Sequence, residues 1–387
     1  MIQKERLIGK LSGKQGPCLI MIGGVHGNEA SGVKALSRVC HELQESKTEL
    51  QGSFYALKGN LAALTQQKRY LDTDLNRLWN RKIIKEVQAG TFQAQTAEEN
   101  ELQQLYSALQ EILQTEAGPF YFIDLHTTSA QTIPFLTVND ALLNRAFTLH
   151  YPVPIILGIE EYIQGPLLSY INELGYVAFG FEGGQHDDQE AYLNHYHFIY
   201  RSMEIIGLKK SSSQHYDTLK KHSKGIQGFY EIISRFGLED QDEFQMLGNY
   251  QNFELIAEKE HFANFNGKAL KATEAFRIFM PLYQKQGGDG YFSIRKIPAF
   301  FMQLSAFLRK RSADRILPLL PGIAWHDRKR SALIINRKVA RFLAKQLFHL
   351  LGYRNKELDQ NHWLMYNREH AARSEEYEGA EWIGKFF

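Results

Sequence analysis

The stretch Gly23-Gly24-Val25-His26-Gly27-Asn28-Glu29 decides how the fold of this chain is interpreted. It follows the apolar run Cys18-Leu19-Ile20-Met21-Ile22, which predicts a short buried strand. The two glycines favour a sharp turn or a close backbone approach. From Glu29 onward, apolar residues recur at helical spacing as far as Leu43. The order is therefore strand, glycine turn, His-x-x-Glu and helix, which places two metal-binding side chains at the carboxyl end of a strand, where open α/β sheets keep their sites.

Composition predicts an ordinary globular protein. The 387 residues are 44% hydrophobic and 23% charged, and the length predicts two or three domains. A net charge of +2 gives no general electrostatic case for a nucleic-acid partner. Cys18 and Cys40 fall in a predicted strand and a predicted helix, so we expect buried thiols and no disulfide.

Neither a signal peptide nor a membrane span is expected. The first 25 residues hold several charged side chains and no apolar h-region. No run approaches the roughly 20 apolar residues that a bilayer requires. We therefore expect a cytoplasmic protein.

Strands and helices alternate through residues 1–210. The expected strands are 18–22, 52–57, 120–125, 153–157 and 176–181, and the expected helices are 29–46, 60–63, 96–114, 140–148, 167–174 and 188–206. This alternation predicts an α/β domain with a mostly parallel or mixed sheet flanked by helices.

The pattern changes after the linker-like run 209–213. Residues 211–300 are expected to form a smaller β domain, with strands at 229–233, 253–257, 276–282 and 291–294. Residues 301–387 are expected to form a helical C-terminal extension, with its clearest helix over Ile334–Leu351. This segment is rich in lysine and arginine. A basic amphipathic helix can bind membranes or acidic partners, although packing against its own protein is the commoner arrangement.

Three side chains could hold a metal ion. Hydrolytic zinc sites commonly use three protein ligands and leave one position open for water. His26 and Glu29 supply two ligands, and His126, at the end of the strand 120–125, offers a third that Asp124 could orient. Two imidazoles and a carboxylate suit zinc but admit other divalent ions. The alternative for His126 is a buried histidine that is only hydrogen-bonded.

A general base and an anion-binding loop complete the candidate site. Glu182 follows the predicted strand 176–181 and is the best candidate to take a proton from a zinc-bound water. The loop with Arg69, Asn76 and Arg77 fits an anion-binding role, unless nearby aspartates simply neutralise the arginines. Three strand ends should converge on one site, which favours function over chance.

Four motifs in this order resemble the succinylglutamate desuccinylase/aspartoacylase family, which has a zinc carboxypeptidase-like fold. They are Gly-Gly-Val-His26-Gly-Asn-Glu29, Arg69-Tyr-Leu-Asp-Thr-Asp74-Leu-Asn76-Arg77, Asp124-Leu-His126-Thr-Thr and Phe-Glu182-Gly-Gly. The resemblance covers about residues 15–295, because the segment ending Gly287-Gly288-Asp289-Gly290-Tyr291 is similar to the small C-terminal domain of that family.

The resemblance implies one Zn²⁺ per chain on His26, Glu29 and His126, with Glu182 activating the water.

By resemblance, Arg69 polarises the scissile amide carbonyl, and Asn76 with Arg77 binds the substrate α-carboxylate. Tyr291 corresponds to a substrate-contacting tyrosine from the small domain.

One position departs from the family pattern. Aspartoacylases place an arginine ten residues before the catalytic glutamate to bind the aspartate side chain, and this chain has Asn172 there. An acyl-aspartate substrate is therefore not expected, unless another arginine such as Arg145 substitutes.

The predicted function is a zinc-dependent amidohydrolase that removes the acyl group from an N-acyl amino acid or a similar small carboxylate. Its partner would be that small molecule, with no nucleic acid, and a homo-oligomer remains open. The rivals are a metallocarboxypeptidase that acts on peptides, an esterase that uses the same zinc centre, and a non-catalytic binding protein that has kept the fold.

Overall fold

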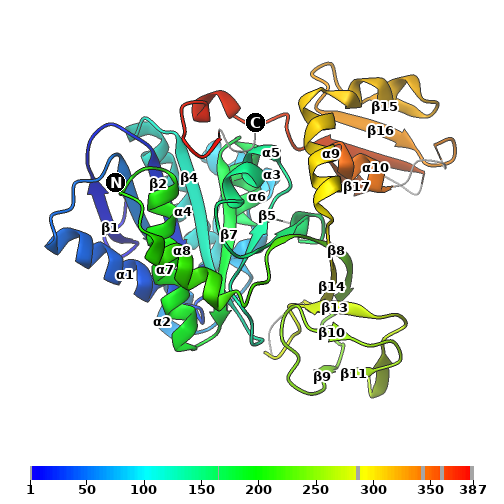
Figure 1. Ribbon diagram of the computed structural model, residues 1–387, viewed down its shortest axis with the longest axis horizontal. Helices are drawn as coiled ribbons and strands as arrows, with labels where there is room; N and C mark the ends of the chain where they lie inside the picture. The colour runs from blue at the N-terminus through cyan, green and yellow to red at the C-terminus, as the bar shows by residue number, and fades with distance from the viewer. Residues whose placement is uncertain (1, 164, 285–287, 341–344, 358–360, 384–387) are drawn as a thin grey trace.

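The computed structural model describes residues 2–163, 165–284, 288–340, 345–357 and 361–383 (Figure 1). The chain first forms the large body that carries α1, α4 and α7. It continues into the small strands β9 to β13 and then into a separate group of strands around β16. The red C-terminal end comes back to the body (Figure 1).

An eleven-stranded mixed sheet runs through the body. Its central pairs β3/β2, β2/β4 and β4/β7 are parallel, as are β5/β6 and β6/β8, whereas β1/β3, β7/β5 and the strands beyond β8 are antiparallel. In spatial order the strands are β1 (Leu7–Ser12), β3 (Ser53–Lys58), β2 (Cys18–Gly23), β4 (Phe120–Thr128), β7 (Val177–Gln185), β5 (Phe135–Val138), β6 (Pro154–Leu157), β8 (Gly228–Gly237), β14 (Asp289–Lys296), β13 (Phe276–Phe279) and β10 (Leu255–Ile256).

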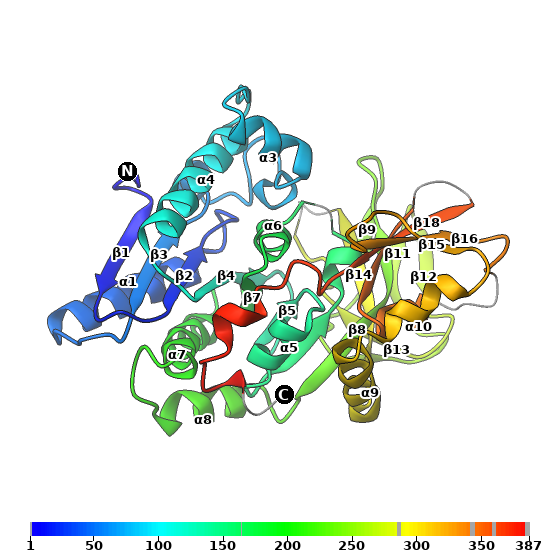
Figure 2. The same ribbon diagram turned by 90° about the horizontal axis from the view of Figure 1, so that it is seen from above.

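Helices cover both faces of this sheet, as the view from above shows (Figure 2). One face packs against α1 (Ala30–Glu45), α5 (Leu142–Thr148) and α7 (Gln189–Ile205). The other packs against α3 (Arg81–Gln88), α4 (Ala97–Thr115) and α6 (Leu167–Glu173). Residues of β2 alternate between the two cores, with Leu19 and Met21 in the first and Ile20 and Ile22 in the second. A strand that is buried on both faces is apolar throughout, which explains the run 18–22.

The expected α/β fold is confirmed, and its helices and strands begin and end within a few residues of the predicted bounds. A capping box begins α4, because the Thr96 hydroxyl accepts from the Glu99 amide and the Glu99 carboxylate accepts from the Thr96 amide. Strands β4 and β7 extend beyond their predicted ends, so His126 and Glu182 lie inside strands. The short helix α2 (Leu61–Gln66) is also confirmed. The sequence reading missed α8 (Ser213–His222), which follows the linker-like run and contacts α7.

The small β region is continuous with the large sheet. Its four predicted strands are present as β8, β10, β13 and β14, and β8 pairs with β6 on one side and β14 on the other. A separate three-stranded sheet, which the sequence reading did not predict, contains β12 (Lys268–Lys271), β11 (His261–Phe265) and β9 (Phe244–Met246). These strands are only three to five residues long, so they carry little periodic signal.

The C-terminal region contains a four-stranded antiparallel sheet. Its elements are α9 (Ala299–Lys310), η3 (Ala313–Leu319), β15 (Ile323–Trp325), β16 (Ala332–Asn336), α10 (Lys345–Leu350), β17 (Tyr353–Glu357) and β18 (His362–Asn367).

The long helix predicted over Ile334–Leu351 is therefore wrong at its start. Residues 332–336 form β16, only residues 345–350 are helical in α10, and residues 341–344 lie outside the described residues. β16 buries Leu333 and Ile335 and pairs with β18, some 30 residues later in the chain. A short apolar run of this kind fits the period of a helix as well as that of a strand. Pairing with the distant strand β18 stabilises the strand here.

Buried ion pairs attach this C-terminal sheet to the body. Arg309 of α9 lies 2.8 Å from Asp140 and 3.1 Å from Glu369. Arg368 lies 3.0 Å from Glu160, which belongs to the short helix η2 (Ile159–Glu161). Buried charges are stable only when they are paired in this way.

The last described residues return to the core of the body, where η4 (Ser374–Tyr377) lies. The Tyr377 hydroxyl donates to the Phe120 carbonyl at 2.5 Å and accepts from the Val177 amide at 3.1 Å. The Trp382 indole donates to the Tyr121 hydroxyl at 2.9 Å. The C-terminal segment therefore covers the amino-terminal ends of strands β4 and β7.

In the described part of the chain, no helix is both long enough and apolar enough to cross a membrane.

We expect Trp382→Ala to lower the free energy of unfolding by about 3–5 kcal/mol, because it removes a buried indole and its hydrogen bond to Tyr121. Denaturant unfolding would measure this change. Phe300→Ala, at an exposed aromatic residue, is the matched control and should stay within about 0.5 kcal/mol of the wild type. Equal effects of the two substitutions would show that the terminal segment does not stabilise the core.

Candidate active site

The turn after β2 positions the first two site residues. Gly24 has a φ of +72°, which favours glycine, and a Cβ on Gly27 would lie 2.1 Å from the Ala63 carbonyl carbon of α2. The chain can therefore press closely against α2 and present His26 and Glu29 just before α1 begins. Both side chains are buried.

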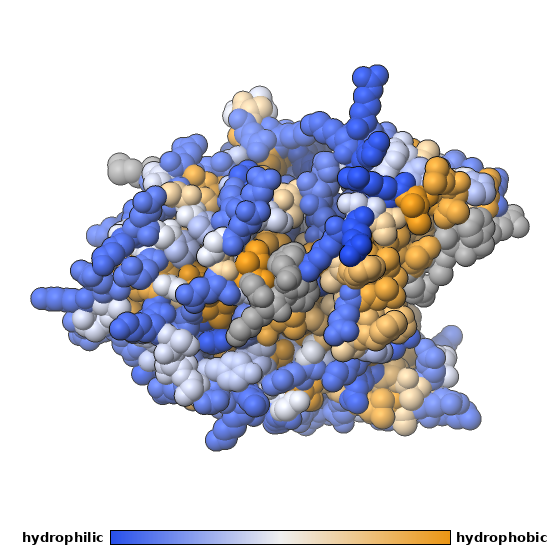
Figure 3. Space-filling model, turned by 45° about the horizontal axis from the view of Figure 1, so that its top comes forward, coloured by the Kyte–Doolittle hydropathy of each residue, from blue (hydrophilic) through white to orange (hydrophobic). Residues whose placement is uncertain are grey.

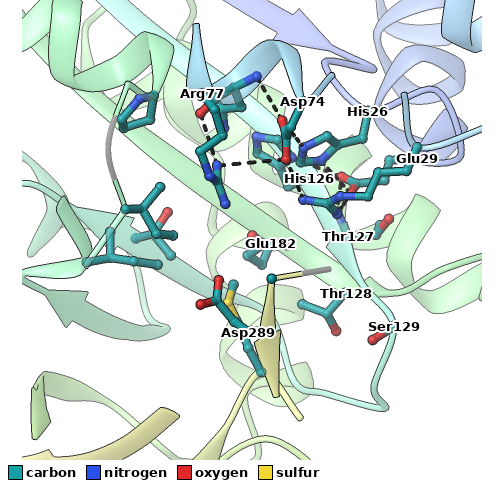
Figure 4. A pocket seen from close by; sticks show the side chains of 18 of the residues that line it. His26, Glu29, Asp74, Arg77, His126, Thr127, Thr128, Ser129, Glu182 and Asp289 are labelled. Atoms are coloured by element: carbon teal, nitrogen blue, oxygen red, sulfur yellow. Dashed lines mark hydrogen bonds and ion pairs between the residues drawn. The ribbon is translucent and has the colours of Figure 1, made fainter. Parts of the chain in front are cut away.

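His26, Glu29 and His126 meet at one point (Figure 4). The Nδ1 atom of His26 lies 2.8 Å from Glu29 Oε1, and Nδ1 of His126 lies 2.9 Å from Glu29 Oε2. One potential ligand atom from each residue falls within 4.8 Å of the others. The three residues come from the β2–α1 turn and from β4, which are neighbours through the parallel β2/β4 ladder.

Carboxylates hold the far side of both imidazoles. Nε2 of His26 lies 3.1 Å from Asp74, and Nε2 of His126 lies 2.6 Å from Asp124. A carboxylate at Nε2 fixes the proton there and leaves the Nδ1 lone pair for a metal ion, as in many zinc sites. The donor set therefore fits a divalent cation.

Electrostatics in the cluster also favours a cation. Although burial opposes the charged form, Asp124 and Glu29 raise the pKa of His126 well above its usual range. Burial likewise opposes ionisation of Glu29, yet His26 and His126 lower its pKa well below normal. The carboxylates of the cluster therefore stabilise positive charge at its centre.

Glu182 stands beside this cluster on β7. It is the direct partner of His126 in the parallel β4/β7 ladder, and its side chain is buried. Its Oε2 atom has no hydrogen-bond partner. Burial raises the pKa of Glu182 to about 7. A buried carboxylate oxygen without a partner next to a metal-binding cluster is typical of a general base.

The loop before α3 brings the arginines to the same cavity. Arg69 lies 3.1 Å from Asp74 and 3.7 Å from Glu29, so its guanidinium borders the cluster. Asn76 is fixed by the Leu167 amide, which donates to its Oδ1 at 2.9 Å. The short helix η1 (Leu75–Arg77) ends the loop, and Arg77 donates to the Asn76 carbonyl at 3.0 Å.

These side chains line one cavity of about 370 Å³. The His–Glu–His cluster, Glu182 and the arginines line this cavity, and its wall also contains other polar and several apolar side chains. The apolar lining residues are Ile159, Ile163, Leu168, Phe179, Met280, Leu282 and Phe292. This combination suits a small molecule with a charged end and an apolar part.

Comparison with known proteins agrees with this geometry. A family model described as "Succinylglutamate desuccinylase/Aspartoacylase catalytic domain" matches residues 15–187, which include all four motifs of the cavity. Residues 15–187, a little under half of the chain, therefore resemble the catalytic domain of the succinylglutamate desuccinylase/aspartoacylase family.

Relatives with curated names match over shorter stretches. A succinylglutamate desuccinylase from Photorhabdus laumondii is 28% identical over 109 residues, which are 28% of this chain and 33% of the relative. An N-acyl-aromatic-L-amino acid amidohydrolase (carboxylate-forming) from Xenopus laevis is 32% identical over 114 residues, 29% of this chain and 34% of the relative. The chain therefore aligns with about a third of the length of these curated relatives.

The fold similarity extends further than the sequence similarity. The solved structure of a succinylglutamate desuccinylase/aspartoacylase from Rhodobacter sphaeroides superposes with a TM-score of 0.57 at 15% identity. The match covers 75% of this chain and 88% of that one. This likeness confirms the fold of the family.

Most of the predicted site residues come together. His26, Glu29, His126, Glu182, Arg69, Asn76 and Arg77 all line the cavity. Asp124 holds His126 as predicted, whereas Asp74, which holds His26, was read only as a neutraliser of arginine.

The structure does not bring Tyr291 to the cavity. Its ring packs among phenylalanines of the small β region, including Phe236 at 5.3 Å and Phe276 at 5.6 Å between ring centroids. The β8/β14 ladder is irregular between Asp289 and Tyr291, so these two residues do not share a face. Asp289 lines the cavity instead.

Neither Asn172 nor Arg145 reaches the cavity. Asn172 donates to the carbonyls of Tyr176 and Ala178 and so ties the end of α6 to β7. Arg145 is buried in the ion-pair cluster with Asp140 beneath the C-terminal sheet. The third arginine of the cavity is Arg235 of β8, which pairs with Asp289. It lies in a strand that carries no recognisable motif, so sequence reasoning missed it.

Glu98 anchors the arginine loop, and sequence reasoning missed it too. Its buried carboxylate accepts from the amides of Leu71, Asp72 and Thr73 at 2.8, 3.0 and 3.2 Å. The Asn60 side chain adds a fourth donor at 3.1 Å. Despite the opposing effect of burial, these donors lower the pKa of Glu98. Helix α4 thereby fixes the loop that carries Arg69 and Arg77.

We expect the protein to bind one Zn²⁺ per chain, and His126→Ala to abolish that binding because it removes one of three ligands. Asp124→Asn should weaken Zn²⁺ binding by about 10–100-fold, since it no longer orients His126. Competition with a chromogenic chelator measures both affinities. His41→Ala, at an exposed histidine on α1, serves as the control and should bind as the wild type does. Unchanged binding in His126→Ala would place the metal elsewhere.

We expect Glu98→Gln to lower the free energy of unfolding by about 1–3 kcal/mol, because an NH₂ group then faces backbone N–H donors. Hydrogen exchange should accelerate in peptides that cover residues 68–77. Glu99→Gln changes the adjacent capping residue and should leave the exchange of that loop unaltered. Equal exchange in both variants would contradict the anchoring role of Glu98.

Proposed function

We propose that this protein is a zinc-dependent amidohydrolase that removes the acyl group from an N-acyl amino acid or a similar small carboxylate. The observation that carries the proposal is the unpartnered Oε2 of Glu182 beside the His26–Glu29–His126 cluster, in a cavity that also holds arginines. The match to the catalytic domain of the family, and the desuccinylase and amidohydrolase names of the curated relatives, support the reaction class.

Zn²⁺ on this cluster would supply Lewis acidity and a water that is activated near neutral pH. Glu182 accepts a proton from the attacking water through Oε2 and delivers it to the leaving amine nitrogen. One carboxylate can perform both steps, because burial holds its pKa near the pH of the reaction. The products are a free carboxylate and a free amine.

Arg69 stabilises the negative charge that develops on the carbonyl oxygen. Its Nη2 donates to Asp74 at 3.1 Å, and its Nη1 lies 3.7 Å from Glu29, so the guanidinium borders the cluster. A guanidinium that is positioned before the reaction requires little reorganisation, which is the basis of oxyanion stabilisation in enzymes.

Asn76 and Arg77 bind the α-carboxylate of the substrate. The Leu167 amide occupies Oδ1 of Asn76, so the side-chain NH₂ remains available as a donor. Arg77 lies 3.9 Å from Asp74, a distance at which the ion pair is loose. A substrate carboxylate can therefore form the closer contact with this guanidinium.

We expect Glu182→Gln to retain zinc and to lower kcat by about 10²–10⁴-fold, because the amide cannot accept the proton. The assay is release of free amine from N-acetyl and N-succinyl amino acids, with apolar, aromatic and acidic side chains, in the presence and absence of a chelator. Glu190→Gln, at an exposed carboxylate on α7, is the matched control.

Wild-type kcat in a zinc-loaded Glu182→Gln variant would exclude the proposed base. Turnover of peptides or esters, without turnover of the acyl amino acids, would show that the substrate belongs to one of those classes instead. Zinc binding without turnover of any compound would indicate a binding protein.

A further inference from the structure

Positive charge is concentrated in one part of this chain. Residues 295–345 contain 13 lysines and arginines and only two acidic residues. The remainder of the chain contains 32 basic and 41 acidic residues. A protein with a net charge of +2 is thus divided into a basic segment and an acidic body, and the basic segment lies in the region of α9 and the C-terminal sheet.

The same segment exposes large apolar side chains. The exposed fractions are 66% for Phe300, 53% for Phe307, 63% for Ile316 and 83% for Leu319. Exposed apolar residues that occur singly need no explanation, but a group of them marks an interaction surface.

These residues lie on the outer side of α9 and on η3. Met302, Ser305 and Arg309 form the buried side of α9, whereas Phe300 and Phe307 lie seven residues apart on the exposed side. An apolar area extends down the right-hand part of the molecule in Figure 3, over the region of α9 and η3, with hydrophilic residues around it.

Cationic side chains alternate with the apolar ones. Lys310, Arg311 and Arg315 are exposed and lie between Phe307 and Ile316 in the sequence. The guanidinium of Arg311 lies 4.7 Å from the ring centroid of Phe307. We call this surface the basic–apolar face; it consists of Phe300, Phe301, Phe307, Lys310, Arg311, Arg315, Ile316 and Leu319.

We propose that the basic–apolar face binds the surface of an anionic lipid bilayer. Lysine and arginine are attracted to the negative potential of acidic headgroups. Phenylalanine, isoleucine and leucine that project from a short amphipathic helix enter the boundary between headgroups and acyl chains. Neither contribution holds a protein firmly alone, and this face supplies both.

A second copy of the chain and a nucleic acid fit this face less well. A symmetric dimer through the face would bring two basic surfaces together, and like charges at an interface are unfavourable. A nucleic acid would use the cations on phosphates and aromatic rings on bases, but it gives no role to Ile316 or Leu319, the latter being the most exposed residue of the face.

The test is flotation of the full chain with vesicles of phosphatidylcholine alone or with about 40 mol% phosphatidylglycerol. We expect binding only to the anionic vesicles, weakened at about 0.5 M NaCl because salt screens the charges. Phe300→Ser/Phe307→Ser and Lys310→Glu/Arg311→Glu/Arg315→Glu should each lower the partition constant by more than about tenfold.

The matched control is Lys34→Glu/Lys82→Glu/Lys85→Glu, which changes the net charge equally at exposed lysines of the body. It should bind vesicles as the wild type does, and thermal unfolding should show that all variants are folded. Absence of wild-type binding, or an equal loss in the control triple, overturns the proposal. A dimer or a DNA complex that the face variants abolish, without lipid binding, also overturns it and assigns the face to that partner.

Discussion

The site depends on the buried carboxylate of Glu29. Its two oxygens lie within 2.9 Å of the Nδ1 atoms of His26 and His126, and Oε2 also accepts from the Thr127 amide at 3.0 Å. A charge that is removed from water in this way must be matched by partners with good geometry, and the partners here come from two segments, the β2–α1 turn and strand β4. The β2–α1 turn and strand β4 can therefore occupy only one relative position. The geometry of the cavity follows from that constraint.

A second layer of carboxylates extends the same constraint outward. Asp124 fixes His126 from within β4, and Asp74 fixes His26 from the arginine loop. The loop is in turn fixed by Glu98, which receives three successive backbone amides. Helix α4 thus positions cavity residues that belong to the arginine loop and not to the helix itself. Networks of this kind hold catalytic groups in place, because the low dielectric of the interior strengthens each hydrogen bond and makes a buried polar group without a partner costly.

The C-terminal region is joined to the body through charge and through aromatic packing. Arg309 and Arg368 reach Asp140 and Glu160 of the body, and Glu160 also lines the cavity. Tyr377 and Trp382 then enter the main core. A region held at both ends in this way presents α9 in a defined orientation, so its exposed apolar and basic residues form a fixed surface. The proposed lipid contact and the proposed chemistry use different residues and can be tested independently.

The sequence by itself determined the α/β body, the His–Glu–His cluster and the place of Glu182. Those features depend on local signals, namely the glycine turn after 18–22, the apolar periodicity of the helices, and motifs at the ends of neighbouring parallel strands. Only the tertiary structure decided that residues 332–336 form a strand, because the partner β18 lies far along the chain. It also decided that Tyr291 turns away from the cavity while Arg235 and Asp289 line it, since an irregular strand register reverses which side chains face inward. Pairing between distant segments has no local signature in the sequence, whereas a turn, a helix and a motif do.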